Sequence, residues 1–271
     1  MFAKSFNISN KKVGLDQPTY FIADIAANHD GDINRAKDLI YLAAEAGADA
    51  AKFQHFQANT IVSNNGFLSL GNQLSHQKSW KKSVFEVYKE ASLNLDWTEI
   101  LLEECKNNGI DFFTSPYSID LVDYVDEYVP AFKIGSGDIT WKDIITHIAK
   151  KNKPVILATG ASSQYDVDNA IKWVAKYNGK LAVLQCNTNY TASLDNFNYI
   201  NLNYLNFLKN RYKNLIIGLS DHTPGHTTVL GAISLGAKIV EKHFTDKNDR
   251  LGPDHKFSMN PKTWNLMVKE S

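Results

Sequence analysis

Tyr20–Phe53 reads YFIADIAANHDGDINRAKDLIYLAAEAGADAAKF, and this stretch decides the fold. Residues 20–26 (YFIADIA) are mostly apolar and too short for a helix, which predicts a buried strand. Residues 33–47 place apolar side chains at helical spacing between an acidic start and a glycine stop, and residues 49–53 return to a strand pattern. A strand, a helix and a second strand in this order predict one βαβ unit.

The same alternation continues along the chain. Further strands are predicted at Asp111–Thr114, Ala131–Ile134, Pro154–Ala158, Leu181–Gln185, Leu215–Leu219 and Lys238–His243. Helical patterns lie between them, at about 96–108, 118–127, 139–150, 163–177, 200–212 and 226–236. Eight apolar strands joined by helices predict a closed parallel (β/α)₈ TIM barrel. An open doubly wound sheet is the alternative, but its glycine-rich fingerprint is absent after the first strand, where the chain reads NHDGD.

Three segments depart from this repeat within a single predicted domain over residues 1–271. Residues 1–19 precede the first strand and are expected to form an arm or small hairpin. Residues 57–94 make a long connection, which is typical of a lid or a contact surface. The eighth helix begins near Pro261 and the chain ends at Ser271, so this helix is expected to be cut short.

Composition excludes several classes of protein. The chain is 44% apolar and 21% charged, with a formal net charge of zero, which is ordinary globular composition and gives no basic surface for nucleic acid or anionic membrane. No apolar run approaches the ~20 residues that span a bilayer, and the N-terminus has no signal-peptide core. Cys105 and Cys186 form no CxxC pattern and are expected to be reduced thiols. These features predict a cytoplasmic protein.

Active sites of such barrels lie at the carboxyl ends of the strands. Polar residues gather at these positions in the sequence: Asp24, His29, Lys52, Gln54, His55, Ser115, Lys133, Ser136, Asp138, Thr159, Gln185, Asn187, Ser220, Asp221, His222, Glu241 and His243. A single histidine here is more often structural, which is the interpretation favoured for His29 and His55. The five tryptophans are scattered and are expected to be packing anchors.

Lys52 and Lys133 lie in otherwise apolar strands. Burying an ammonium group costs on the order of several kcal/mol unless an anion pairs with it. Each lysine could pair with a nearby carboxylate. Together with the hydroxyls of Ser115, Ser136 and Ser220, they could instead hold a ligand that carries both a phosphate and a carboxylate.

His222 and His243 end neighbouring strands seven and eight, and imidazole suits a first-row divalent metal with open positions for a substrate oxygen. Glu241 and His243 are two residues apart, so both side chains should face the barrel interior.

Seven stretches resemble the sialic acid synthases, which include the N-acetylneuraminate, legionaminate and pseudaminate synthases. They are FIADIAANHDG, AGADAAKFQ, FKIGSGD, ATG, GLSDHTPG, GAKIVEKHFT and DRLGPDHKFSMNP. They occur in this order and cover residues about 20 to 261, nearly the whole chain.

The resemblance implies an enzyme that condenses phosphoenolpyruvate with an N-acetylmannosamine-like aldose. Phosphate leaves and a nine-carbon 2-keto sugar acid forms, as in the synthesis of lipopolysaccharide or capsule. It implies a divalent metal, Mn²⁺ before Mg²⁺ or Co²⁺, on His222 and His243, and a possible homodimer. The catalytic positions it implies are Asp24, Lys52, Glu241 and Asp254. The substrate-binding positions are Gln54, Ser115, Lys133, Ser136, Thr159, Asn187 and Ser220.

The chain departs from the family pattern at four places. Asp24 replaces a family glutamate that stabilises positive charge at C2 of the substrate, Ala158 replaces a serine, and residues 186–191 read CNTNYT where the family reads Cys-Thr-Asn-x-Tyr-Pro. The family's C-terminal antifreeze-like domain, which supplies an arginine to the acceptor of a partner subunit, is absent from these residues.

Two other functions remain open. A 3-deoxy-octulosonate or heptulosonate phosphate synthase would need a cationic cluster for its phosphorylated sugar, but the only arginines are Arg35, Arg211 and Arg250. A catalytically silent barrel with a binding or assembly role is suggested by Asp24 and by the absent domain.

Overall fold

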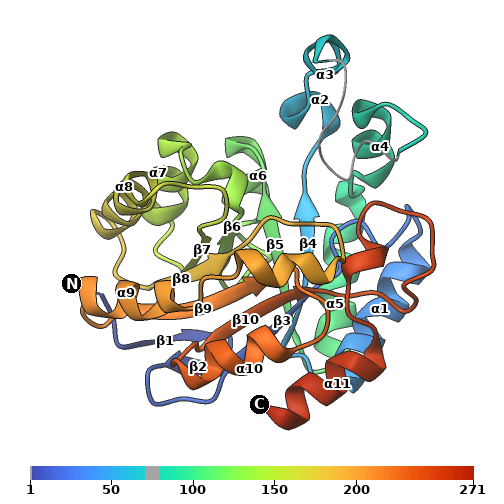
Figure 1. The fold of residues 1–271 in the computed structure, drawn as a ribbon. Helices are drawn as coiled ribbons and strands as arrows, with labels where there is room; N and C mark the ends of the chain where they lie inside the picture. Colours follow the sequence, from blue (N-terminus) through green and yellow to red (C-terminus); the bar gives the residue numbers. More distant parts are fainter. Residues whose placement is uncertain (1, 71–79) are drawn as a thin grey trace.

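Eight parallel strands alternate with helices in the computed structural model, which describes residues 2–70 and 80–271 (Figure 1). The hydrogen-bonded order is β5-β4-β3-β10-β9-β8-β7-β6, and β5 lies beside β6, so the sheet curves into a barrel with its seam between these two strands. The strands are β3 (Tyr20–Asp24), β4 (Ala50–His55), β5 (Asp111–Pro116), β6 (Phe132–Ile134), β7 (Val155–Ala158), β8 (Leu181–Cys186), β9 (Ile216–Asp221) and β10 (Ile239–His243). The predicted TIM barrel is confirmed.

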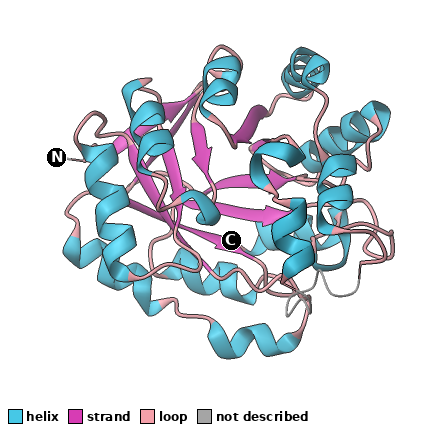
Figure 2. Cartoon of the chain, turned by 90° about the horizontal axis from the view of Figure 1, so that it is seen from above, coloured by secondary structure: helices cyan, strands magenta, loops and turns pink. Residues whose placement is uncertain are grey.

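The helices form a layer around the strands, as the view from above shows (Figure 2). They are α1 (Ile33–Glu45), α5 (Thr98–Asn107), α6 (Ile119–Val125), α7 (Lys142–Lys150), α8 (Gln164–Ala175), α9 (Asn203–Arg211), α10 (Thr227–Ser234) and α11 (Pro261–Glu270). Local sequence sets their ends: the Asp32 side chain caps α1 by accepting from the Asn34 amide at 2.8 Å, and Gly47, with φ +94°, follows the helix. The final helix has ten residues and buries Trp264 against Phe244.

The interior is divided into two apolar cores because successive side chains of a strand point to opposite faces. The outer core lies between strands and helices and contains residues such as Phe53, Phe112 and Val183. The inner core fills the barrel and contains Ile22 and Phe113. Strands buried on both faces read as continuous apolar runs, which is the pattern of the sequence.

Residues 1–19 contain an antiparallel hairpin of β1 (Ser5–Ile8) and β2 (Lys11–Gly14). Phe6, Ile8 and Val13 of this hairpin are buried in the inner core. The hairpin lies at the amino-terminal end of the barrel, opposite the long connection after β4 (Figure 1). This end is therefore filled by apolar side chains, and the polar site must lie at the other.

The described residues of the connection after β4 contain three short α-helices, α2 (Ala58–Ile61), α3 (Asn64–Ser69) and α4 (Val84–Ala91). They stand above the carboxyl ends of the strands in Figure 1. The predicted long connection thus overlies the mouth of the barrel, while its residues 71–79 lie outside the described part. In the residues that the structure describes, every helix is too short or too polar to cross a bilayer.

Candidate active site

The carboxyl ends of β3, β4, β9 and β10 bring the predicted site residues to one level of the barrel. Asp24 is in register with Lys52 on one side and with His243 on the other. Glu241 is in register with Ser220. Because parallel strands in register carry neighbouring side chains on the same face, residues more than 200 positions apart in sequence become direct neighbours.

Glu241 and His243 face the barrel interior together, as their two-residue spacing predicts. Lys242, between them, points the other way and forms a buried ion pair with Asp221. The lysine therefore takes part in the structure of the outer layer and not in the polar cluster of the interior.

Four charged side chains in the interior form a continuous ion-pair chain. The Lys52 ammonium lies 2.6 Å from a carboxylate oxygen of Asp24 and 3.7 Å from one of Glu241. Lys133 lies 3.5 Å from the other oxygen of Glu241, which also accepts a hydrogen bond from Ser220 at 3.1 Å. The four charged side chains are at most 6% exposed. The carboxylates that compensate both buried lysines thus belong to the protein itself.

The pKa values of this chain of charges are strongly perturbed. Burial raises the pKa of Asp24, against the opposing effect of Lys52. Burial also disfavours the charge on Glu241, but the ammonium groups of Lys133 and Lys52 outweigh it and hold the pKa of Glu241 at about 2. Burial disfavours the charge on Lys52, yet Asp24 and Glu241 raise its pKa above the usual value. Perturbation of this kind in one cluster is typical of a functional site.

The rings of His222 and His243 lie side by side next to these charges, with centroids 5.4 Å apart. Burial lowers the pKa of His222 to about 3 and that of His243 to about 4, so both imidazoles are neutral at pH 7. Nδ1 of His222 lies 2.7 Å from the Asn187 carbonyl oxygen, to which it can only donate. Around His243, Asp24 lies 3.6 Å from Nε2 and Asp254 3.9 Å from Nδ1.

These two imidazoles fit a divalent metal. The proton on Nδ1 of His222 leaves Nε2 as a lone-pair donor, and a backbone oxygen that orients the ring is the usual support for a metal-ligating histidine. Nδ1 of His243 is buried and has no hydrogen-bond partner among the described residues. One nitrogen of each ring could approach a shared ion at the ~2.1 Å that imidazole requires. The described residues contain no arrangement of three such side chains, so remaining positions would fall to water or substrate.

Three serine hydroxyls and a thiol lie at the carboxyl ends of β5, β6, β8 and β9. The Ser115 hydroxyl is buried without a hydrogen-bond partner in the described part of the chain. Ser136 Oγ accepts from the Gly160 amide at 2.9 Å. The Cys186 thiol, whose pKa is raised by burial, is hydrogen-bonded by both Ser136 and Ser220. The serines therefore offer small polar groups beside Lys133.

Two predicted substrate-binding residues, Thr159 and Asn187, use their side-chain polar atoms in hydrogen bonds within the protein. The Thr159 hydroxyl donates to the Leu184 carbonyl at 3.1 Å. The Asn187 side chain accepts from Gln185 at 2.7 Å and donates to the Tyr199 carbonyl at 2.5 Å. The carbonyl oxygen of Asn187 is also the group that orients the first imidazole. This backbone role has no signature in the sequence.

His29 and His55, the two histidines expected to be structural, both form hydrogen bonds within the fold. His55 lies between Thr114 and Thr98, with ring-nitrogen distances of 2.7 and 2.9 Å to their hydroxyls. His29 Nδ1 accepts from the Gly31 amide at 3.1 Å. Both are buried away from the ion-pair chain, and burial lowers the pKa of each to about 4.

Sequence reasoning missed the aromatic side chains that enclose the two imidazoles. Tyr190 packs edge-on against His222 at 4.4 Å between centroids, and Phe257 packs against His243 at 4.9 Å. Tyr190 follows the end of β8 by four residues, and Phe257 is the last residue of a short 3₁₀-helix (His255–Phe257) after β10. Neither residue lies at a strand end, where polar site residues were expected, so neither was predicted. Tyr190 does lie within the segment that departs from the family pattern.

A cavity of about 520 Å³ opens above this cluster. His243, Asp254, Gln54 and Asp138 are among the polar residues that line it. Burial raises the pKa of Asp138 to about 6. The remaining lining is largely apolar and comes in part from the connection after β4: Ala27, Phe56, Thr60, Ile61, Val62, Phe67, Trp80, Val87, Tyr88, Ala91, Tyr117, Gly137, Trp141, Tyr190 and Pro253. Trp80 and Trp141, expected to be packing anchors, thus border a cavity. A space of this size suits a small-molecule ligand.

Comparison with known proteins agrees with this fold. Residues 39–271 match the NeuB family. The N,N'-diacetyllegionaminic acid synthase of Campylobacter jejuni is 36% identical over 256 residues, which cover 93% of this chain and 75% of that protein. The structure of N-acetylneuraminic acid (sialic acid) synthetase from Leptospira borgpetersenii, in complex with citrate, superposes with a TM-score of 0.86 at 28% identity, covering 99% of this chain and 87% of that chain.

The spore coat polysaccharide biosynthesis protein SpsE of Bacillus subtilis has a structure that superposes with a TM-score of 0.83 at 33% identity, covering 98% of this chain and 70% of that chain. The resemblance to the sialic acid synthases and the prediction of a sugar acid synthase are confirmed at the level of the family. The chain belongs to the NeuB family.

Proposed function

We propose that this enzyme condenses phosphoenolpyruvate with an N-acylated amino sugar aldehyde of the N-acetylmannosamine kind. C3 of phosphoenolpyruvate forms a bond to the aldehyde carbon, water adds at C2, and the C2–O bond to phosphate breaks. The products are inorganic phosphate and a nine-carbon 2-keto sugar acid. The observation that carries the proposal is the convergence of Lys52, Lys133 and the pair His222 and His243 at one mouth of the barrel.

Phosphoenolpyruvate would bind beside Lys133 and Ser115, next to the ion-pair chain. Among the described residues, the Lys133 ammonium contacts one oxygen of Glu241 at 3.5 Å and the Ile134 carbonyl at 3.1 Å, so it has capacity left for a ligand anion. The buried hydroxyl of Ser115 supplies a donor. Charge-assisted hydrogen bonds of this type are stronger than neutral ones, which suits a ligand with a phosphate and a carboxylate.

Asp24 and Glu241 would act on the charge that develops during the reaction. Attack by C3 leaves positive charge at C2, and a buried carboxylate stabilises such charge in a low dielectric. Glu241 is ionised at every pH near neutrality because its pKa is about 2. Asp24 is held against Lys52 at 2.6 Å, which also fixes the direction of the ammonium group.

His222 and His243 would hold a divalent ion, Mn²⁺ before Mg²⁺ or Co²⁺. When bound, such an ion supplies Lewis-acid polarisation of the aldehyde oxygen. The chain's own contribution is to keep both rings neutral and to orient His222 through the Asn187 carbonyl. A direct test is Mn²⁺ titration by calorimetry: His243→Ala should lose binding, and full retention of binding and activity would refute the metal assignment.

The acceptor is proposed to be uncharged. The residues that line the cavity in the described part of the chain include Asp138 and Asp254 but neither lysine nor arginine, so a sugar phosphate would be repelled. All three arginines are engaged elsewhere: Arg35 and Arg250 with Asp246, and Arg211 with Asp168. The lack of a cationic side chain among the described residues of this cavity favours a free amino sugar over the 3-deoxy-octulosonate or heptulosonate type of substrate.

The test is phosphate release from phosphoenolpyruvate with Mn²⁺ and a panel of sugars. Release with N-acylated hexosamines, and not with pentose or tetrose phosphates, is the expected result. Release only with sugar phosphates would support the octulosonate or heptulosonate type of reaction. Absence of release with every sugar, in a protein that still binds phosphoenolpyruvate, would support a silent barrel and refute the proposal.

The location is proposed to be the cytoplasm. Cys105 and Cys186 are both buried and unbridged, which suits a reducing compartment.

A further inference from the structure

A buried ion pair lies one residue before each of the two imidazoles of the site. The Lys242 ammonium contacts a carboxylate oxygen of Asp221, and both side chains are 1% exposed. The two residues are in register on β10 and β9. Asp221 precedes His222 in the chain, and Lys242 precedes His243. The ion pair therefore joins the two strands at the last step before both rings.

The charges of this pair interrupt an otherwise apolar surface of the barrel. Ile217 and Leu219 of β9 and Val240 of β10 face the helical layer and belong to the outer core. Asp221 and Lys242 continue these rows at the two-residue period of a strand. A buried ion pair adds little net stability, and well-packed apolar side chains of similar volume often serve as well or better. Stability alone therefore does not account for charges at these two positions.

The contacts of the ion pair hold the chain on both sides of His222. The Lys242 ammonium also donates to the Thr223 carbonyl oxygen at 2.8 Å. The Asp221 carboxylate accepts from the Thr223 amide at 3.0 Å and from its hydroxyl at 2.9 Å. The residues before and after His222 are thus bound to each other and to one lysine. Since the backbone has only two soft dihedrals per residue, these contacts fix the direction in which the His222 side chain leaves the chain.

The rings of His222 and His243 receive their relative position from this part of the fold. The Nδ1 atom of His222 lies 2.7 Å from the Asn187 carbonyl oxygen, so its ring is held both at the backbone and at one nitrogen. His243 follows Lys242 directly, and the Met259 amide donates to its carbonyl oxygen at 2.8 Å. A shared ion requires one nitrogen of each ring at ~2.1 Å, so the separation of the two strand ends decides whether both can reach it.

We propose that Lys242 and Asp221 are positioning residues, which set the separation and direction of the two imidazoles for a shared divalent ion. The proposal rests on the proposed function, and it extends the metal site to an ion pair on the outer face of the strands. Groups that orient metal ligands from behind typically change metal affinity by about 10- to 100-fold. The affinity for the ion should therefore depend on two residues that do not contact it.

The experiment uses the double variant Asp221→Asn/Lys242→Met, which removes both charges and keeps an acceptor for the Thr223 amide. Calorimetric titration with Mn²⁺ should show an affinity reduced by about 10- to 100-fold. Phosphoenolpyruvate, titrated without metal, should bind within about twofold of the wild-type affinity, because its proposed contacts Lys133 and Ser115 lie on β6 and β5. A general loosening of the barrel would weaken both affinities, so the difference between them separates positioning from a purely structural role.

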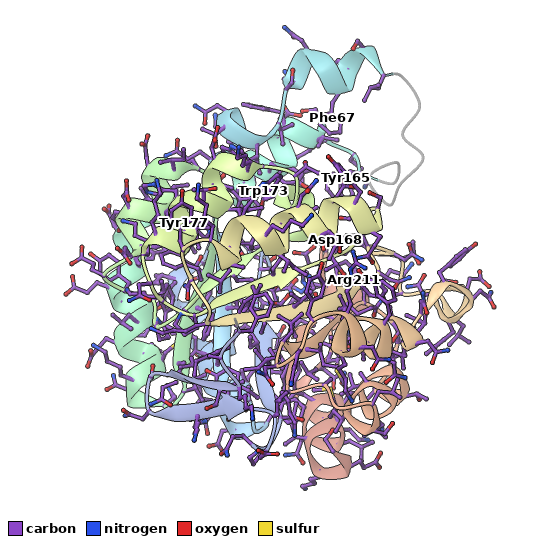
Figure 3. The ribbon with its side chains drawn as sticks, turned by 90° about the vertical axis from the view of Figure 1, so that its left-hand side faces the viewer. Phe67, Tyr165, Asp168, Trp173, Tyr177 and Arg211 are labelled. Carbon is purple, nitrogen blue, oxygen red and sulfur yellow. The ribbon has the colours of Figure 1, made fainter. Side chains whose placement is uncertain are left out.

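The control variant is Asp168→Asn, which removes a carboxylate that pairs with Arg211 between α8 and α9, away from the two imidazoles (Figure 3). It loses charged hydrogen bonds of a similar kind and should keep the wild-type affinity for Mn²⁺. Circular dichroism and urea unfolding establish that each variant is folded. If the double variant does not fold, Asp221→Asn alone takes its place, with a change of affinity in the same direction.

Two results would overturn the inference: a folded variant with wild-type affinity for Mn²⁺, or an affinity for phosphoenolpyruvate that falls as strongly as that for Mn²⁺. If the wild type itself does not bind Mn²⁺, the proposed metal site fails, and the Nδ1 proton of His222, observed by NMR, still decides the role of the ion pair. Retention of its hydrogen bond to the Asn187 carbonyl in the double variant would overturn that role, and loss of the bond would support it.

Discussion

Asp24 occupies the centre of the polar cluster, and its carboxylate makes three contacts at once. One oxygen lies 2.6 Å from the Lys52 ammonium and 3.6 Å from Nε2 of His243, and the other accepts from the Ala26 amide at 3.1 Å. The aspartate is one methylene shorter than the glutamate of the family pattern, and the ion pair with Lys52 occupies one of its oxygens. Its charge therefore compensates the buried ammonium of Lys52, and the proposed function adds a catalytic role.

Asp24→Asn is predicted to reduce kcat by about 100-fold or more, because it removes a charge that stabilises the positive centre at C2. It should also destabilise the protein by about 3 kcal/mol, since it leaves Lys52 with only the more distant Glu241 in a buried site. Steady-state kinetics and urea unfolding measure the two effects. Asp24→Glu keeps the charge and serves as the control, and wild-type kcat in Asp24→Asn would exclude a catalytic role.

Lys133→Ala is predicted to act mainly on the binding of phosphoenolpyruvate. The KM for phosphoenolpyruvate should rise by about 10- to 100-fold, which corresponds to the loss of one charge-assisted hydrogen bond, with a smaller change in kcat. The pKa of Glu241 should rise from about 2, because Lys133 is the strongest influence that lowers it. Lys151→Ala removes a lysine that pairs with Asp123 on the surface and should change neither constant. An unchanged KM in Lys133→Ala would remove this lysine from the binding site.

At the scale of elements, α8 and α9 are joined by one buried carboxylate. Asp168 of α8 binds the guanidinium of Arg211 through both oxygens, and it also accepts from Tyr212 and from Gln164 at 2.5 Å (Figure 3). Burial disfavours the charge, but these four hydrogen bonds outweigh it and lower the pKa of Asp168 to about 2. The Asp168 carboxylate thus links the packing of α8 to that of α9.

Asp168→Asn is predicted to lower the free energy of unfolding by about 2 kcal/mol, because the charged hydrogen bonds become neutral. The pKa of Asp168 in the folded protein lies below the value near 3.9 of an unfolded chain. Its stabilising effect is therefore complete above pH ~4 and is lost as the pH falls toward about 2. Chemical unfolding at pH 7 tests the magnitude, and Asp16→Asn, at an exposed site, is the control. Equal stability of the two variants would contradict the prediction.

At the scale of the whole molecule, four of the buried histidines have a lowered pKa, which makes the stability of the fold sensitive to acid. Burial lowers the pKa of His29, His55 and His243 to about 4 and that of His222 to about 3. Unfolded histidine has a pKa near 6.5, so the unfolded chain takes up these protons first as the pH falls. Stability should therefore decrease steadily from about pH 6.5 to about pH 4.

His55→Gln is predicted to reduce the slope of unfolding free energy against pH in this range by about 1.4 kcal/mol per pH unit, the contribution of one proton. His55 suits this test because its partners are the hydroxyls of Thr98 and Thr114, remote from the ion-pair chain. Urea unfolding at pH values between about 4.5 and about 7, in steps of about half a pH unit, measures this slope. A slope identical to that of the wild type would show that His55 does not titrate on unfolding.

The sequence by itself determined the barrel and the end at which the site lies. Strand and helix patterns depend on the spacing of neighbouring residues, so all eight strands were predictable. Strands with buried faces carry most of their polar residues toward their carboxyl ends. This placed Asp24, Lys52, Glu241 and His243 at one mouth before their contacts were known. The resemblance to the sialic acid synthases rested on the same local motifs.

Only the tertiary structure decided how these groups are paired. That Lys52 and Lys133 are compensated by Asp24 and Glu241, and that a backbone carbonyl orients His222, depends on side-chain direction across strands distant in sequence. The same holds for the ring contacts of Phe56 with Tyr88 and with Tyr117, which join separate segments of the chain. Such contacts leave no periodic pattern in the chain, because the energy that fixes them comes from packing between elements and not from the propensities of neighbouring residues.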